Sequence, residues 1–287
     1  MNHTKDTLII VLGSLIVIAL AIWGFSFQDD LADGINSVAN PVEIEKKWEL
    51  PHELNEISGM DWLEPGKVIC VQDEAGILFI YDLNENRISE EIEFAKSGDY
   101  EGITINKNDA YVLRSDGQLF EIKDFRSNKK INDTNIGFSA KDNMESLVFD
   151  HKNNYLLTMP KNVKSSAEFM AIYQIPLDSK KADKTPEIKI PFENKDLKTT
   201  KSQKLLKRFS PSDIAIHPKT GDYYILDGKN PKLLILDASG NLQKIRELDR
   251  NQFEQPEGIT FSPDGTLFIS NEAGKNKANI LQVNLDN

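Results

Sequence analysis

Acidic residues recur along the chain at two positions of each predicted hairpin: just before its first strand and just after its second strand. Five of them precede the first strand of a hairpin: Glu56, Glu101, Glu145, Asp213 and Glu257. Four more follow the second strand of a hairpin: Asp73, Asp116, Asp227 and Glu272. Antiparallel pairing brings the start of the first strand and the end of the second to the same end of a sheet. The sequence therefore predicts that these carboxylates gather at one end of a shared channel.

Such a group of carboxylates suits a hard cation, because calcium takes six to eight oxygen ligands and magnesium also prefers oxygen. Without a cation, two carboxylates about 6 Å apart repel by roughly 3 kcal/mol at an effective dielectric constant near 20. The alternative is that each acid accepts hydrogen bonds from backbone amides of a neighbouring sheet and that no ion binds. The sequence leaves both interpretations open. Three cations lie among the acids and are candidates for steadying an anionic group: Arg114, Lys161 and Lys229.

Other chemistries fit the sequence less well. A nucleophilic serine needs a histidine beside it, but His151 and His217 lie in turns expected at the opposite end of the channel. No His or Cys spacing suits zinc, and no motif indicates haem, flavin or nucleotide. The net charge of −11 argues against a nucleic-acid partner, since phosphate binding needs a basic face. The single cysteine, Cys70, lies within an apolar strand and is interpreted as a buried, inert thiol.

A repeated strand positions the acids. Five segments align without gaps, and their first residues are 43, 44, 67 and 45 positions apart. The segments begin at Ser58, Glu101, Glu145, Ser212 and Glu257. Each is followed by a turn and by further apolar strands. A unit of about 44 residues with four short antiparallel strands is typical of a propeller blade.

The repeat predicts an all-β fold, a propeller of five four-stranded blades, with six as the alternative. The long third interval is interpreted as one blade plus about 22 inserted residues, within a basic segment at 178–208. That segment carries ten Lys and Arg against five Asp and Glu, and Lys198 to Phe209 could form a short helix. It is interpreted as a solvated excursion, with contact to anionic headgroups as the alternative. The last repeat has only three strands, so Val42 to Leu50 is predicted to supply its outer strand and cover an open edge.

The start of the chain predicts a membrane anchor. Residues 8–27 contain no ionisable side chain, and twenty helical residues span about 30 Å, the thickness of a hydrocarbon core. A cleaved signal peptide, with Ala19-Leu20-Ala21 at the cleavage site, is the alternative. Residues 1–7 are expected in the cytoplasm, residues 28–41 form a tether, and residues 42–287 form the propeller. Lys5 and the amino terminus favour an N-terminus inside and a domain outside.

Several sequence segments along the propeller resemble those of the SdiA-regulated family. They are Glu-Ile-Ser-Gly at 56–59, Tyr-Glu-Gly at 100–102, Pro-Ser-Asp-Ile-Ala-Ile-His-Pro-Lys-Thr-Gly at 211–221 and Gln-Pro-Glu-Gly-Ile-Thr-Phe-Ser-Pro-Asp-Gly at 255–265. The resemblance covers residues 42–287 and implies a single-pass protein of the bacterial inner membrane, with its domain on the periplasmic side. It implies no established activity. Ser-Asn-Glu-Ala-Gly at 270–274 departs from the Ser-Glu-Pro-Asn of relatives.

We therefore expect a propeller that binds calcium or magnesium and a small or extended ligand on its acidic face. A bound cation could polarise a phosphate ester or a lactone and supply hydroxide for its hydrolysis. A non-catalytic platform for protein interaction or sensing is the alternative. The sequence leaves open whether the protein is an enzyme, and it names neither the substrate nor the partner.

Overall fold

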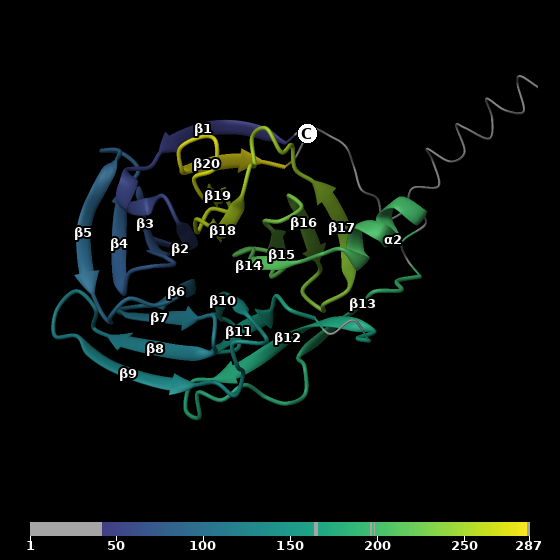
Figure 1. Ribbon diagram of the computed structural model, residues 1–287, viewed down its shortest axis with the longest axis horizontal. Helices are drawn as coiled ribbons and strands as arrows, with labels where there is room; N and C mark the ends of the chain where they lie inside the picture. Colours follow the sequence, from purple (N-terminus) through teal and green to yellow (C-terminus); the bar gives the residue numbers. More distant parts are fainter. Residues whose placement is uncertain (1–41, 164–165, 196, 198, 286–287) are drawn as a thin grey trace, which may run out of the picture.

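Short antiparallel strands make up almost the whole domain. The computed structural model describes residues 42–163, 166–195, 197 and 199–285. In these residues twenty strands form five four-stranded sheets, arranged like blades around a central channel (Figure 1). The predicted five-bladed propeller is confirmed, and the alternative of six blades is wrong for the described chain.

Each blade runs outward from its first strand at the channel. Blade 1 contains β2 (Ile57–Glu64), β3 (Lys67–Gln72), β4 (Ile77–Asp82) and β5 (Arg87–Glu93). Blade 2 contains β6 (Tyr100–Asn106), β7 (Asp109–Arg114), β8 (Gln118–Lys123) and β9 (Lys130–Asn135). Blade 3 contains β10 (Met144–Asp150), β11 (Tyr155–Pro160), β12 (Phe169–Pro176) and β13 (Ile188–Pro191). Blade 4 contains β14 (Pro211–Ile216), β15 (Tyr223–Asp227), β16 (Lys232–Leu236) and β17 (Leu242–Glu247), and blade 5 contains β18 (Pro256–Phe261), β19 (Leu267–Asn271), β20 (Asn279–Asn284) and β1 (Glu43–Glu49).

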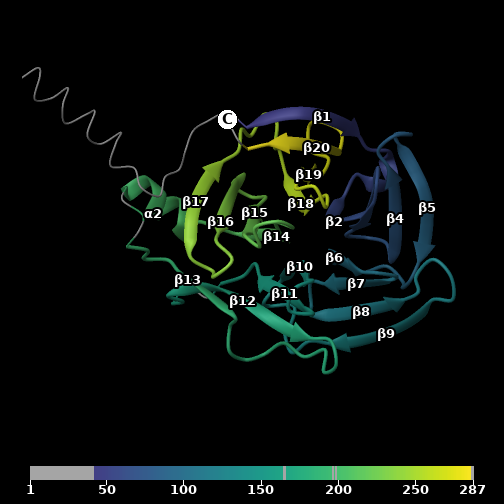
Figure 2. The same cartoon turned by 180° about the vertical axis from the view of Figure 1, so that it is seen from behind.

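The ring closes through the first strand of the domain. β1 pairs antiparallel with β20, from Glu43 opposite Asn284 to Glu49 opposite Asn279, and lies on its outer side (Figures 1 and 2). The indole nitrogen of Trp48 donates to the carbonyl of Leu83 in blade 1 at 2.7 Å. The predicted closure is therefore confirmed, and β1 also fastens blade 5 to blade 1.

A β-bulge opens the first strand of every blade. The register shifts between Ile57 and Gly59, and the equivalent shift recurs at Tyr100/Gly102, Met144/Ser146, Pro211/Asp213 and Pro256/Gly258. Backbones crowd at this point: a Cβ at Gly59 would lie 2.8 Å from the carbonyl oxygen of Glu101 in the next blade. Glycine is required there because the blades approach more closely than a side chain allows. The bulge leaves one residue per blade unpaired at the channel end.

The hydrophobic core is divided among the contacts between blades. Five apolar clusters fill these contacts, and each contains one residue from the same position of a first strand: Met60, Ile103, Leu147, Ile214 or Ile259. Cys70 is fully buried, and burial raises the pKa of its thiol, so the sequence interpretation of an inert cysteine agrees with the structure. Trp62 packs on Phe268 with ring centroids 5.2 Å apart, as expected for an aromatic between blades.

The basic segment at 178–208 is partly blade and partly excursion. Its residues Ile188–Pro191 form β13, the outer strand of blade 3, and α2 (Thr200–Lys207) follows near blade 4. The predicted short helix is confirmed; the Thr199 side chain caps it by accepting from the N–H of Ser202 at 3.0 Å, and Leu206 is buried. A 3-10 turn, η1 (His52–Leu54), precedes β2.

The expected membrane helix at 8–27 lies outside the described residues; in the described part of the chain, no helix has the length and hydrophobicity needed to cross a membrane.

Candidate functional site: the acidic end of the channel

The bulges give each blade the same three positions at one end of the channel. One is the unpaired bulge residue, the second stands two residues before it, and the third follows the second strand of the blade. In four blades the backbone N–H of the third position donates to the carbonyl of the second, at 2.8–3.3 Å. In blade 1, for example, the N–H of Asp73 donates to the carbonyl of Glu56. These backbone bonds hold the three side chains of a blade together.

The three positions carry seven carboxylates and one lysine, which we call the acidic cluster. The bulge residues are Ser58, Glu101, Glu145, Ser212 and Glu257. The residues two before them are Glu56, Asp99, Asn143, Ser210 and Gln255. The residues after the second strands are Asp73, Ser115, Lys161, Gly228 and Glu272. Blade 4 supplies only serines and glycine, so the cluster is bounded there by small side chains.

Lys161 is the internal counter-ion of the cluster. Its ammonium nitrogen lies 2.6 Å from Oε2 of Glu145, whose Oε1 accepts from the side chain of Asn143 at 2.6 Å. Burial works against the charge of Lys161, but Glu145, Glu257 and Glu101 outweigh it and raise the pKa of the ammonium group above its usual value. One lysine thus serves three glutamates.

Two of these glutamates are poorly compensated. Burial, together with the charges of Glu145, Asp99 and Glu257, raises the pKa of Glu101 to about 9, and Lys161 offsets only part of the effect. Burial also raises the pKa of Glu257 to about 7. A Cβ at Gly228 would lie 2.8 Å from Oε1 of Glu257, so the missing side chain in blade 4 makes room for this carboxylate.

The second half of the cluster lies between blades 5 and 1. Burial and contact with the carboxyl group of Glu56 raise the pKa of Glu272 to about 8. Burial, followed by the charges of Glu56, Glu74 and Asp99, raises the pKa of Asp73 to about 6. In this half of the cluster, Oδ1 of Asp73 is buried without a hydrogen-bond partner among the described residues. Buried oxygens of this kind are unusual in folded proteins and are free to accept from, or coordinate, a ligand.

The comparisons with known proteins agree with the sequence resemblance. The model of the protein family described as SdiA-regulated matches residues 39–275, which is most of the chain. The protein belongs to the SdiA-regulated family. No curated protein sequence matches it.

Two solved structures share the fold of this SdiA-regulated protein. The glutaminyl cyclase of Myxococcus xanthus superposes with a TM-score of 0.57 at 14% identity, over 85% of this chain and 98% of that one. A luciferin-regenerating enzyme superposes with a TM-score of 0.53 at 12% identity, over 84% of this chain and 96% of that one. At such identities the likeness shows the propeller fold alone.

Asp213 and Asp227 lie apart from the bulge positions and are engaged in holding blades together. Asp213 is 2% exposed, and its two carboxylate oxygens accept from the N–H groups of Ile214 at 2.8 Å and Ile259 at 2.9 Å. The equivalent of Glu257 in blade 4 is Ser212, so Asp213 stands one residue out of phase with the cluster. Asp227 is fully buried and forms an ion pair with Lys232. Both acids follow the alternative of hydrogen-bonding within the fold.

Of the three cations that were candidates for steadying an anionic group, one lies in the acidic cluster and two lie outside it. Arg114 donates two hydrogen bonds to Asp116, from Nε to Oδ1 at 3.0 Å and from one terminal nitrogen to Oδ2 at 2.8 Å. The two side chains therefore pair with each other at the end of β7 rather than with the cluster. Lys229 is exposed in the turn after β15. Lys161 is the member of the three that the structure brings into the cluster.

Sequence reasoning missed two acids. Asp99 belongs to the cluster and accepts from the hydroxyl group of Ser115; it stands two residues before Glu101, as Glu56 does before Ser58, and this spacing could have found it. Asp61 lies farther along β2. It accepts from Thr104 Oγ1 at 2.9 Å and Thr260 Oγ1 at 3.0 Å, and so links blade 1 to blades 2 and 5.

Two further observations bear on ligands at this end. Among the described residues, no group of three or more His, Cys, Asp or Glu side chains is arranged so that it could hold a metal ion as it stands. A groove of about 920 Å³ includes Lys161 and extends to the end of α2 and the residues after it, where Lys207, Arg208 and Phe209 line it; Glu168 and Glu193 line it as well. The groove offers an extended ligand a path outward from the edge of the cluster.

Proposed function

We propose that the acidic cluster binds a hard divalent cation, calcium in the first place and magnesium as the alternative. The observation that carries the proposal is the excess of carboxylates: Glu101 is largely buried among Glu145, Asp99 and Glu257 with Lys161 as the shared cation. Like charges this close are costly in the folded protein. The buried, unpartnered oxygen of Asp73 is a further ligand of the type that calcium prefers.

Protons explain how the cluster persists without an ion. With pKa values of about 9 for Glu101, about 8 for Glu272 and about 7 for Glu257, several carboxyl groups keep a proton near neutral pH. An arriving cation would replace these protons and draw the carboxylates together. Binding is therefore coupled to proton release, and the affinity is expected to rise with pH.

Calorimetric titration of the full chain in detergent tests this proposal. Calcium should bind more tightly at pH 8.5 than at pH 6, with heats that depend on the buffer because protons are released. The double variant Glu101→Gln, Glu257→Gln should lose the binding, whereas Glu91→Gln, Glu93→Gln, on the outer strand β5, should keep it. Saturating calcium should also raise the melting temperature of the wild-type protein, since ligand at a hundred times its dissociation constant stabilises by about 2.7 kcal/mol. Indifference of the wild-type protein to calcium, magnesium and manganese would exclude a metal function.

A cation at this position would also support ester hydrolysis. It would polarise a phosphate ester or a lactone and lower the pKa of bound water, while Lys161 contacts an anionic oxygen and the groove beside it holds the rest of the substrate. Two propellers of the same fold are named as enzymes, a glutaminyl cyclase and a luciferin-regenerating enzyme. Calcium-dependent turnover of a nitrophenyl phosphate or of a simple lactone would support hydrolysis. A co-purifying protein without turnover would favour an interaction platform.

We also propose that residues 8–27 anchor the propeller in the bacterial inner membrane, with the domain on the periplasmic side. Support comes from the apolar run and from the flanking charges. The protein should remain in the membrane pellet through carbonate washing, and protease added to spheroplasts should digest the domain. A periplasmic species that begins near Ile22 would instead indicate a cleaved signal peptide.

A further inference from the structure

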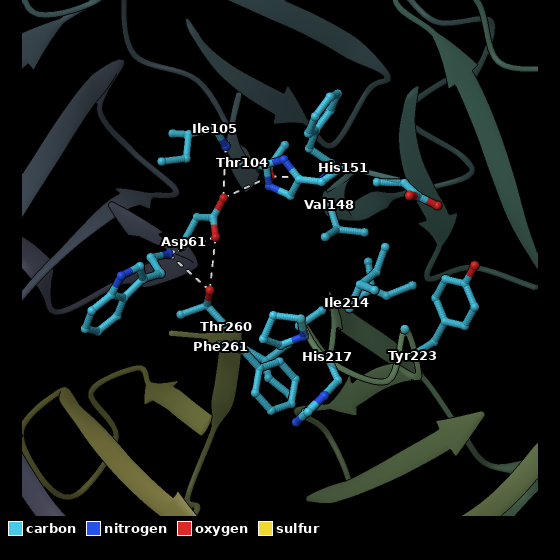
Figure 3. Close-up of a pocket in the computed structure, with 18 of the residues that line it drawn as sticks. Asp61, Thr104, Ile105, Val148, His151, Ile214, His217, Tyr223, Thr260 and Phe261 are labelled. Carbon is cyan, nitrogen blue, oxygen red and sulfur yellow. Dashed lines mark hydrogen bonds between the residues drawn. The ribbon is translucent and has the colours of Figure 1, made fainter. Parts of the chain in front are cut away.

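A second cavity, of about 850 Å³, lies at the other end of the channel (Figure 3). It is lined by the far ends of the first strands of all five blades and by the turns that follow them. The first strands begin at the acidic cluster and end at this cavity, so the two sites occupy opposite ends of the propeller. Nothing in the proposed cation site requires this second cavity.

The inner wall of the cavity is apolar. Its floor contains the five residues that also enter the five core clusters, each at most 2% exposed: Met60, Ile103, Leu147, Ile214 and Ile259. Val148 and Phe261 line the sides, and Tyr223 lies at the edge (Figure 3). Ile216 also lines the cavity. A wall of this composition favours a ligand with an apolar body.

The two acidic groups that line the cavity, Asp61 and Asp150, are engaged in hydrogen bonds within the fold. Besides the two threonine hydroxyl groups, Asp61 accepts from the N–H groups of Trp62 at 2.8 Å and Ile105 at 2.9 Å. Asp150 accepts from the N–H groups of Lys152 and Asn153 and from the side chain of Asn153, at 2.8–3.0 Å. Asp61 thus accepts four hydrogen bonds and Asp150 three, so most of their acceptor sites are already used within the fold.

The rim is basic. Three exposed lysines stand there, Lys107, Lys152 and Lys219, together with the imidazole groups of His151 and His217. In the part of the chain that the structure describes, no carboxylate lies within ion-pair distance of the three ammonium groups. Nδ1 of His217 accepts from the N–H of Thr220 at 3.2 Å, which fixes the ring in the turn after β14. The rim thus presents donors and positive charge.

We propose that this cavity binds a small organic anion, with its apolar body against the floor and its carboxylate, sulfonate or phosphate group among the lysines of the rim. Charge complementarity sets the orientation, because the acids among the described residues that line the cavity are Asp61, on β2, and Asp150, at the end of β10, and both accept several hydrogen bonds. A ligand held this way closes the end of the channel opposite the acidic cluster.

A matched pair of probes tests the proposal on the full chain. 1-Naphthylacetate and 1-naphthylacetamide share an aromatic body and differ in the negative charge; calorimetric titration should give the anion an affinity about tenfold higher. The triple variant Lys107→Gln, Lys152→Gln, Lys219→Gln should weaken the anion to the level of the amide and leave the amide unchanged. Removing three exposed lysines elsewhere, Lys130, Lys141 and Lys184, is the control for a general loss of charge.

A second variant tests whether the probes bind inside the cavity or only to the exposed lysines. Val148→Trp should fill the space above the floor and abolish binding of both probes, with an unchanged circular dichroism spectrum as the check on folding. Equal affinities for the two probes, no binding of either at millimolar concentration, or a loss with the control triple variant as large as with the rim variant would each overturn the proposal. Retained binding in a folded Val148→Trp protein would do the same.

Discussion

A chain that begins at Asn55 is expected to lose cooperative unfolding and to aggregate, whereas one that begins at Asn40 folds. The shorter chain lacks β1, which covers the outer edge of β20 along its length. It also loses Leu50, which is 4% exposed and whose N–H donates to the carbonyl of Ala278 at 2.8 Å. An uncovered strand edge next to an opened core is a template for association.

Rescue by permutation makes this prediction specific. Because Glu43 stands opposite Asn284, a short Gly-Ser linker can join the end of the chain to residues 42–50 as a hairpin. The protein that begins at Asn55 and carries this appended strand should recover a single thermal transition. Size-exclusion chromatography and calorimetry distinguish the outcomes. Equal melting temperatures for the chains from Asn40 and from Asn55 would contradict the closure.

The architecture was predictable because it repeats. The period of about 44 residues, the three-stranded last repeat and the strand-like segment at 42–50 together specified five blades and their closure. The blade 3 boundary was not predictable in detail: β13, at Ile188–Pro191, lies inside the segment interpreted as an insertion. Its four residues give too short an alternation, and the prolines at 186 and 191 and the many lysines around it are typical of a loop.

The candidate site was predictable only in part, because a bulge changes the phase of a strand by one residue. Glu101, Glu145 and Glu257 share the bulge position, and the gapless alignment pairs them with Ser212. Asp213, one residue later, points between blades instead. Residue type alone does not separate these environments, since period-two alternation sends neighbouring side chains to opposite sides.

The two kinds of buried acid should respond to neutralisation with opposite signs. Asp213→Asn should destabilise the protein by about 2–4 kcal/mol, because its amide group faces backbone N–H groups that need an acceptor. Burial raises the pKa of Asp213 as well, but the N–H groups of Ile259, Ile214 and Leu147 donate to this carboxyl group and offset part of the rise. Glu101→Gln should raise the melting temperature in the presence of a chelator at pH 8, because glutamine is neutral already, whereas the glutamate must take up a proton when the chain folds.

The pH dependence follows from the direction of the pKa shift. Burial and neighbouring carboxylates raise the pKa of Glu101 from 4.5 to about 9, so between these values the folded protein holds a proton that the unfolded chain releases. Raising the pH therefore favours unfolding, and the stability of the ion-free protein should fall from about pH 5 to pH 9. Calcium should flatten this dependence by replacing the proton.

Thermal unfolding of the three proteins across that pH range measures both effects. Glu101→Gln should show a weaker loss of stability with rising pH than the wild-type protein, whereas Asp213→Asn should lie below the wild-type protein throughout. A domain of this size shifts its melting temperature by about 2–4 °C per kcal/mol, so both differences are within reach of calorimetry. If Glu101→Gln melts lower than the wild-type protein in chelator at pH 8, its carboxylate is a hydrogen-bond acceptor like Asp213. The excess charge that supports the cation proposal would then not exist.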